Sequence, residues 1–478
     1  MSNGTGPNEK RVAIIGGGPG GYAAAFAGAD LRLNVTLIDV EPDPGGVCLH
    51  RGCIPSKALL HVAKVLTDAR EAEHWGITFG KPAIDLAKMR EGKIKVVERM
   101  TSGLGALCKS RNVTYLRGRA SFTDSNTLHV TDERGGHDTD ERFDYVVIAS
   151  GSRPMSMPDL FVHSPRIMNS TDALEIADIP TTLLVVGGGY IGLELGSVYA
   201  ALGSKVSVVE MSPAILPGAD DDLVRVLSRR MQSVFDSMSF NSKVVATHEE
   251  KDGVKVTIQG PDGTASDRKF EKVLVCIGRK PNSSGLALNS TKVEVDERGF
   301  IKVDNQRRTT DPCIFAVGDV AGEPMLAHKA SHEGRIAVEV IAGRDTTFEP
   351  RAIPAVVFTD PELAWCGLTE NQAVKEGRDV NIARFPWTAS GRASTLNRND
   401  GLTKVLTDPE TGLVLGVGIV GAGAGELISE GALAIEMGAL ADDIRFTIHP
   451  HPTLGETIME SAEIIFGSGT HVYHPQAG

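Results

Sequence analysis

The stretch RVAIIGGGPGGYAAAFAGADLRLNVTLIDV at residues 11–40 consists of an apolar run, a glycine cluster, a run of small residues and a second β-branched run. The stretch TLLVVGGGYIGLELGSVYAALGSKVSVVEM at residues 182–211 repeats that order. In both copies an acid ends the second run, 23 residues after the first glycine, at Asp39 and Glu210. Each copy therefore predicts a strand, a tight turn, a helix and a second strand.

The glycine spacing in both copies is typical of a dinucleotide-binding turn. The triplets are Gly16, Gly18 and Gly21 in the first copy and Gly187, Gly189 and Gly192 in the second. The first glycine of such a turn allows the bend, the second lets the backbone approach a pyrophosphate, and the third lets the helix pack closely on the strand. The helix N-terminus attracts the phosphates, and the acid accepts hydrogen bonds from a ribose. Two copies predict two bound dinucleotides.

Later apolar runs complete the two halves. DYVVIASGSRP (144–154) and KVLVCIGRKPN (272–282) both lead into a glycine, a basic residue and a proline, and we interpret them as equivalent closing strands. A third run, TTDPCIFAVGDVAG (309–322), reaches Asp319. That acid could hold the sugar-like chain of FAD, or it could belong to an ordinary turn at the end of a strand.

Composition narrows the class of protein. With 478 residues the chain is too long for one hydrophobic core, and we expect two to four domains. The net charge of −12 argues against nucleic acid as the main partner. No run approaches the ~20 apolar residues of a membrane-spanning helix, and the opening MSNGTGPNEKR carries no visible secretory signal. We therefore expect a cytoplasmic protein without a membrane partner.

Two of the six cysteines lie close together in GGVCLHRGCIPSKALL, residues 45–60. A regular helix would hold the Cα atoms of Cys48 and Cys53 about 8–9 Å apart, whereas a disulfide needs less than about 7 Å. A bridge therefore requires a bent backbone, which Gly52 permits. Because four intervening residues are unusual for zinc, we expect no metal. Beside dinucleotide folds, such a pair indicates electron transfer between thiols and a nicotinamide, with a flavin as mediator.

The chain resembles the class I pyridine nucleotide–disulfide oxidoreductases over roughly residues 10–466, and within that family the members that oxidise dihydrolipoamide. The resemblance rests on motifs in the family's order, namely GGGPGG, GGVCLHRGCIPSKALL, GGGYIGLELG, CIGRKPN, IFAVGDVAG and HPHPTLGE. It implies an α/β fold with two Rossmann-like dinucleotide-binding domains, for FAD and NAD, and a C-terminal α+β dimerisation domain. The expected segments are 1–150 and 281–350 for FAD, 151–280 for NAD and 351–478 for dimerisation.

The resemblance also assigns cofactor residues. For FAD it implies Gly16, Gly18, Gly21, Asp39, Ser150, Gly151, Asp319, Met325, Leu326 and Ala327. For NAD it implies Gly187, Gly189, Gly192, Glu194, Glu210 and Gly278. The carboxylate of Glu210 favours NAD over NADP because it would repel a ribose 2′-phosphate. No arginine follows Glu210 until Arg225, so the sequence offers no evident phosphate clamp.

By the same resemblance, Cys48 exchanges with the substrate and Cys53 lies nearer the flavin. Lys57 approaches the flavin ring, paired with Glu194. In HPHPTLGE (449–456), His451 is the base and Glu456 orients it, with His449 as the other candidate. Histidine suits removal of a thiol proton near neutral pH.

The implied reaction is oxidation of protein-bound dihydrolipoamide by a Cys48–Cys53 disulfide, with hydride passing through FAD to NAD⁺. The implied partners are a second copy of the chain and the lipoyl domains of 2-oxo-acid dehydrogenase or glycine-cleavage complexes. Two alternatives stay open. One is a disulfide reductase of the same family that runs on NAD(P)H, since LHR inside the cysteine loop departs from the usual leucine-asparagine-valine. The other is a catalytically silent flavoprotein that serves as an assembly subunit.

Overall fold

In the computed structural model, residues 10–132, 138–158 and 160–473 are described. They form two compact units, each built from three stretches of the chain. The first unit draws on 1–58, 85–155 and 278–349, and the second on 59–84, 156–277 and 350–478. The division into four segments expected from the sequence stays a prediction.

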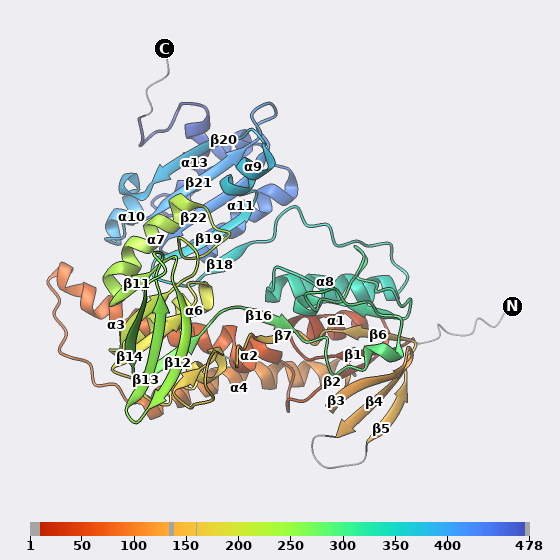
Figure 1. Cartoon of the computed structure of the whole chain (residues 1–478). Coiled ribbons are helices and arrows are strands. Elements are labelled where there is room, and N and C mark those ends of the chain that lie inside the picture. The colour runs from red at the N-terminus through yellow and green to blue at the C-terminus, as the bar shows by residue number, and fades with distance from the viewer. Residues whose placement is uncertain (1–9, 133–137, 159, 474–478) are drawn as a thin grey trace. The chain divides into compact units, whose positions relative to one another are not determined.

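The first unit is organised by a sheet whose central part is parallel (Figure 1). Its strands, in spatial order, are β17 (Ile314–Ala316), β6 (Tyr145–Ile148), β1 (Arg11–Ile15), β2 (Asn34–Asp39), β3 (Thr114–Asp124), β4 (Thr127–Asp132) and β5 (Thr139–Arg142). The pairs β3–β4 and β4–β5 are antiparallel. The apolar runs that predicted strands in this half are therefore strands β1, β2, β6 and β17.

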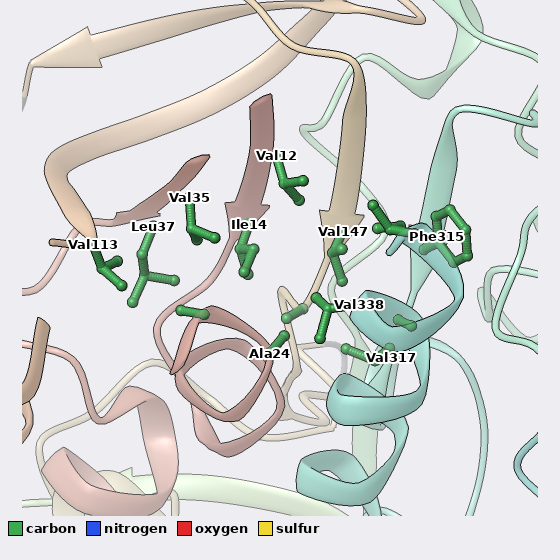
Figure 2. Packing of buried hydrophobic residues seen from close by; sticks show 14 of the residues in the cluster. Val12, Ile14, Ala24, Val35, Leu37, Val113, Val147, Phe315, Val317 and Val338 are labelled. Carbon is green, nitrogen blue, oxygen red and sulfur yellow. The ribbon is translucent and has the colours of Figure 1, made fainter. Parts of the chain in front are cut away.

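Two helices cover one face of this sheet, α1 (Pro19–Asp30) and α8 (Ala327–Ile341). Figure 2 shows Val12, Ile14, Leu37 and Val147 directed from the strands toward the helices that carry Ala24 and Val338. Burying each side chain of this size stabilises the fold by roughly 1.5–3 kcal/mol. Gly334 of α8 lets the two helices approach closely, since a Cβ there would clash with the carbonyl oxygen of Gly20 on α1.

Further elements complete the first unit. They are α2 (Gly46–Arg51), α4 (Leu86–Ser110), η2 (Leu288–Ser290), η3 (Gly318–Val320), and the antiparallel pair β7 (Ser152–Pro154) and β16 (Arg279–Pro281). Helix α3 (Cys53–Glu71) begins in this unit, and its residues from Leu59 onward belong to the second. The two predicted closing strands thus end in β7 and β16, which pair with each other.

The second unit contains a parallel sheet of the same plan. Its strands, in spatial order, are β11 (Ser237–Ser239), β10 (Lys205–Val209), β9 (Thr182–Val186), β15 (Lys272–Val275) and β8 (Ile167–Met168). An antiparallel sheet accompanies it, made of β12 (Lys243–Glu250), β13 (Gly253–Gln259) and β14 (Ala265–Phe270). The helices of this part are η1 (Ala72–Trp75), α5 (Ser170–Leu174), α6 (Tyr190–Leu202) and α7 (Asp221–Val234).

The C-terminal part of the second unit is an antiparallel sheet with helices, as expected for an α+β domain. Its strands, in spatial order, are β18 (Ala355–Val357), β19 (Glu362–Gly367), β22 (Val414–Gly421), β21 (Leu402–Thr407) and β20 (Asn381–Pro386). Its helices are α9 (Glu370–Glu376), η4 (Trp387–Ala389), α10 (Gly391–Thr395), α11 (Ala424–Met437), α12 (Ala441–Phe446) and α13 (Glu456–Ile465). Helix α11 packs on β19 and β22, and α13 packs on β20 and β21. No helix within 10–132, 138–158 and 160–473 is long and apolar enough to cross a membrane.

Candidate active site

The first glycine loop joins β1 to α1 and has the geometry of a phosphate-binding turn. Gly16 has φ +107°, and a Cβ there would clash with the carbonyl oxygen of Ala149. A Cβ at Gly21 would clash with the carbonyl oxygen of Gly16, so this glycine sets how closely α1 packs on the strand. Gly18 begins α1 without a side-chain cap, which leaves the N–H groups of the first turn to a ligand. The residues present therefore fit a dinucleotide.

The second glycine loop, between β9 and α6, repeats this geometry. Gly187 has φ +106°, and a Cβ there would clash with the carbonyl oxygen of Cys276. A Cβ at Gly192 would clash with the carbonyl oxygen of Gly187. At Gly189, which begins α6 without a side-chain cap, a Cβ would meet no described atom within 4 Å. The second loop is thus also suited to a pyrophosphate.

Each predicted ribose acid lies beside the middle of its loop. The Asp39 carboxylate accepts hydrogen bonds from the backbone N–H of Gly17 and, at 2.9 Å, from that of Glu41. Glu210 accepts from the backbone N–H of Gly188 at 2.6 Å and of Ser212 at 2.7 Å. Burial raises the pKa of Asp39, and the Gly17 N–H works against that rise. In both loops a carboxylate is held where the strand ends, as the repeat predicts.

Asp319 lies on the short helix η3 and is held by a residue that the sequence did not single out. The hydroxyl of Ser152, on β7, donates to Asp319. Arg279, on β16, donates from Nε to the Ser152 hydroxyl at 2.7 Å and from Nη2 to the Ser152 carbonyl oxygen at 2.8 Å. In the sequence, only the similarity of the two closing stretches drew attention to Ser152 and Arg279. That similarity gave no reason to link them to Asp319.

A buried carboxylate supports the same turn. Glu333 is fully buried on α8 and accepts from the Gly318 N–H at 2.6 Å. Two cations compensate its charge, Lys329 at 3.0 Å and Arg307 at 2.9 Å. The predicted Met325, Leu326 and Ala327 lead into the N-terminus of α8, where Leu326 is the N-cap without a side-chain cap bond. The turn before α8 is therefore fixed by an ion network that the sequence reasoning missed.

The other predicted residues near this turn are also brought together. Ser150 donates from its hydroxyl to the carbonyl oxygen of Asn282 at 2.8 Å, and the Asn282 amide donates to the Ser150 carbonyl at 2.9 Å. Gly151 has φ +70° and Gly278 has φ +121°, so each closing stretch turns through a conformation that favours glycine just before β7 or β16. The two hydrogen bonds thus join the residue pair that follows β6 and β16.

The two cysteines flank a break between helices. Helix α2 ends at Arg51, α3 begins at Cys53, and a Cβ at Gly52 would lie 2.8 Å from the carbonyl oxygen of Val47. The bend expected at Gly52 is therefore present. Cys48 is partly buried, and Cys53 is exposed at the start of α3.

The thiols interact with each other and with two nearby groups. A hydrogen bond with the Cys53 side chain and burial raise the pKa of Cys48, and the Lys57 ammonium works in the opposite direction. Cys53 lies at the N-terminus of α3, where the helix dipole favours a thiolate. Burial raises the pKa of Tyr22 on α1 to about 12, with smaller contributions from both cysteines. Tyr22 is thus a neighbour of the pair that the sequence reasoning did not name.

The HPHPTLGE segment leads into α13 in the second unit. His451 contacts Glu456 through Nδ1 at 2.8 Å, and its side chain is 73% exposed. Glu456 also accepts from the Thr453 N–H at 2.7 Å. Partial burial works to raise the pKa of Glu456, but the bonds from Thr453 and His451 outweigh it and hold the pKa below its ordinary value.

His449 is in a different position. Its Nε2 contacts Glu430 at 2.7 Å and its Nδ1 contacts the Thr447 carbonyl oxygen at 2.8 Å, while the side chain is 6% exposed. Both ring nitrogens are therefore engaged. Of the two candidates for the base, His451 is the one whose ring is open to an incoming thiol.

Two predicted pairings join residues of different units. Lys57 belongs to the first unit, and Glu194 is a buried residue of α6 in the second, where it accepts from the Phe358 N–H at 3.0 Å. Cys48 and His451 are divided in the same way. The Lys57–Glu194 pair and the approach of His451 to Cys48 stay predictions.

Comparison with known proteins agrees with this arrangement. The pyridine nucleotide-disulphide oxidoreductase family matches residues 10–334, and the dimerisation domain of that family matches residues 353–462. A dihydrolipoyl dehydrogenase of Vibrio parahaemolyticus is 47% identical over 98% of both chains, and one of Bacillus subtilis is 43% identical over 98% of both chains.

Solved structures agree as well. The crystal structure of LpdA from Mycobacterium tuberculosis superposes with a TM-score of 0.88 at 28% identity, covering 95% of this chain and 99% of the other. The flavoprotein disulfide reductase RclA from Escherichia coli superposes with a TM-score of 0.85 at 25% identity, covering 96% of this chain and 99% of the other. The chain belongs to the pyridine nucleotide-disulphide oxidoreductase family.

Proposed function

We propose that this chain is a flavoprotein that oxidises protein-bound dihydrolipoamide to lipoamide and delivers the electrons to NAD⁺. The observation that carries this proposal is the Cys48–Cys53 thiol pair at the break before α3, in the same unit as a complete dinucleotide loop. The relatives named dihydrolipoyl dehydrogenase, identical at 47% and 43% of positions, support dihydrolipoamide over other disulfide substrates.

The chemistry starts with a Cys48–Cys53 disulfide. A substrate thiolate attacks Sγ of Cys48, the bond between the cysteines breaks, and Cys53 leaves as a thiolate. The second substrate thiolate then attacks the substrate sulfur of the mixed disulfide, which releases lipoamide and leaves Cys48 as a thiolate that takes a proton. Two electrons have passed to the pair. Of the two substrate protons, one ends on Cys48 and the other is taken by the base.

The local structure favours this direction of attack. A thiol that is stabilised as a thiolate is the better leaving group. The N-terminus of α3 stabilises the Cys53 thiolate in this way. The pKa of Cys48, in contrast, is raised by the hydrogen bond with Cys53 and by burial. Cys48 is therefore suited to exchange with substrate and Cys53 to pass the electrons on.

The cofactor site is formed by the first loop with Asp39 and Asp319, which would hold the ADP part and the ribityl chain of FAD. When bound, FAD supplies a two-electron relay between a dithiol and a nicotinamide. The second loop with Glu210 would bind NAD⁺. The backbone N–H groups of each loop bind pyrophosphate, and the carboxylates bind ribose hydroxyls.

His451 serves as the base that takes the substrate thiol proton. Its Nδ1 contacts Glu456, whose carboxylate stabilises the imidazolium that forms. Because the pKa of Glu456 lies below its ordinary value, Glu456 stays ionised near neutral pH.

The base and the thiols lie in different units of one chain, and the chain carries a dimerisation domain. We propose a homodimer in which the partner subunit's His451 acts on Cys48, working in the cytoplasm on lipoyl domains of a multienzyme complex. Mixing His451→Gln and Cys48→Ser proteins tests this arrangement. A heterodimer has one intact site, so activity should return once the subunits exchange. Exchange without any activity would rule out the shared site.

The proposed activity is tested by two substitutions in the HPHPTLGE segment. His451→Gln should keep FAD and NAD⁺ binding and lower kcat for dihydrolipoamide by about 10²–10⁴-fold, the usual contribution of a general base. His449→Gln is the matched control and should lose much less. Faster turnover of another disulfide with NADPH than of dihydrolipoamide with NAD⁺ would favour a different reductase. Absence of turnover with a reducible flavin would favour an assembly subunit.

A further inference from the structure

A second histidine–glutamate pair lies one helical turn beyond the His451–Glu456 pair. His471 contacts Glu460 of α13 through Nδ1, and the His471 backbone N–H donates to the same carboxylate at 3.4 Å. Glu456 and Glu460 are four residues apart on α13, which puts their side chains on one face, about 5–6 Å apart at Cβ. The two pairs are therefore electrostatic neighbours.

The residues after α13 run back along the helix toward this site. The Ser468 N–H donates to the Glu463 carbonyl oxygen at 3.2 Å, and Thr470 donates from its N–H and its hydroxyl to the Glu463 carboxylate at 3.3 and 3.2 Å. His471 then reaches Glu460, one turn nearer the N-terminus of α13. The segment 468–471 therefore carries an imidazole toward the His451–Glu456 pair.

The charge of His471 matters because its partner Glu460 is buried. The Glu460 side chain is 4% exposed, whereas His471 is 56% exposed. A buried carboxylate needs a compensating charge. The Glu460 hydrogen bond raises the pKa of His471 above its ordinary value, and Glu456 and Glu463 add to the rise. Because this pKa is raised on folding, the ion pair is complete below about pH 6.5, the usual histidine value, and is lost as pH rises through the higher folded pKa.

Charged groups on the elements packed against α13 are engaged elsewhere. On β20 and β21, Arg384 binds Asp222 and Lys404 binds Asp222 at 3.0 Å. On α12, Arg445 forms an ion pair with Asp442, and Asp443 accepts from the Leu440 N–H at 2.8 Å. The groups that act on His471 are thus the three glutamates of α13.

We propose that Glu460 and His471 are positioning residues for the base His451, and that the imidazolium of His471 offsets the charge of Glu460. While His471 is protonated and offsets the charge of Glu460, Glu456 alone supplies the negative charge that stabilises protonated His451. Without this offset, a second carboxylate acts on His451 and holds its proton to higher pH. The inference rests on the proposed role of His451 as base.

The test is the titration of His451 in the full-length, FAD-loaded protein by NMR of ¹³C-labelled histidine, with the signal identified by its loss in His451→Gln. In His471→Asn the His451 titration should move upward by on the order of half to one pH unit, as expected for one added charge at partly screened distance. The double variant Glu460→Gln/His471→Asn should return it to the starting value. His471→Lys, which keeps the positive charge, should leave it unchanged.

The matched control is His129→Asn. The His129 ring contacts Asp140 at 2.7 Å and Asp138 at 3.5 Å on the β4–β5 hairpin, so its loss also leaves acids without a partner but should not move His451. An unchanged His451 titration in His471→Asn, or an equal shift in the double variant, would overturn the proposal. The pH profile of kcat/KM for dihydrolipoamide should shift with the NMR titration. If the titration shifts but no lipoamide is turned over, the proposed function fails and the electrostatic coupling stands.

Discussion

The two glycine loops have matching turns, but different segments lie over them. Gly16 and Gly187 have φ +107° and +106°, and both loops are crossed by a later backbone N–H, of Gly45 to the Gly17 carbonyl at 2.7 Å and of Leu216 to the Gly188 carbonyl at 3.0 Å. Beyond this point the loops differ. In the first, Gly46 follows at once and its backbone packs against Gly18. In the second, the space beside Gly189 is open to 4 Å among the described residues.

This difference fits a first loop that retains its dinucleotide as a cofactor and a second loop that exchanges its dinucleotide as a substrate. The start of α2, the helix that carries Cys48, packs against Gly18 of the first loop, so a dinucleotide bound there would have this segment beside it. A dinucleotide bound at the second loop would meet no such segment within 4 Å of Gly189 among the described residues. The same contact that closes the first loop also fixes the thiol segment beside it. We therefore expect FAD to be retained and NAD⁺ to exchange.

The largest effect is expected from Gly46→Ala. Gly46 has φ +55°, and an added Cβ would lie 2.5 Å from the Gly18 Cα, so either the loop or α2 must move. The purified variant should contain little FAD and show dihydrolipoamide turnover lower by about 10²-fold or more. Each factor of ten in rate corresponds to about 1.36 kcal/mol of activation free energy. The flavin-to-protein absorbance ratio and Tm measure this.

The control for Gly46→Ala is Gly76→Ala. Gly76 also has a positive φ, +79°, but a Cβ there would meet no described atom within 4 Å. This variant should lose only the backbone preference, roughly 1 kcal/mol, and keep its flavin. Full flavin content in Gly46→Ala would contradict the proposal that the contact between Gly46 and Gly18 helps the first loop to retain its cofactor.

A smaller, selective effect is expected from Gly189→Ala. The added methyl group has room in the protein but points to the place where a pyrophosphate would approach. KM for NAD⁺ should rise about 10–100-fold, which corresponds to about 1.4–2.8 kcal/mol, while flavin content and KM for dihydrolipoamide stay the same. Loss of flavin in this variant would mean that the second loop, and not the first, holds the resident cofactor.

The smallest effect is expected from Glu210→Gln. A glutamine can still accept the Gly188 N–H bond that Glu210 accepts at 2.6 Å, so the loop should keep its shape. Removing the charge weakens the repulsion of a ribose 2′-phosphate. The ratio of kcat/KM for NAD⁺ to that for NADP⁺ should fall by about tenfold. Asp39→Asn, in the other loop, should leave this ratio unchanged, and an equal fall in both variants would contradict the assignment of the loops.

The sequence predicted those parts of the fold and site that are encoded by short spacings. The glycine triplets, the acids 23 residues after them, the bend at Gly52 and the His451–Glu456 spacing each depend on neighbours along the chain. Each of these patterns reflects one local turn or one helix terminus.

Contacts between distant segments could not be predicted in this way. Ser152 lies 167 residues from Asp319, and 127 residues separate it from Arg279. Glu333 supports the Gly318 turn from inside a helix, where the sequence suggests only an ordinary i, i+4 pair with Lys329. The pairing of His471 with Glu460 depends on the chain reversing after α13. Such contacts follow from the packed fold and have no local pattern.

The role of the Cys48–Cys53 pair as the link between dihydrolipoamide and NAD⁺ is tested most directly by anaerobic double mixing of the FAD-loaded protein, first with one equivalent of dihydrolipoamide and then with NAD⁺. We predict that Cys48 and Cys53 become available to alkylation after the first mixing, with FAD still bound. The second mixing should form one NADH per thiol pair and restore the disulfide. Cysteines that stay unreactive after dihydrolipoamide, or NADH that forms equally well in Cys48→Ser, would contradict this role.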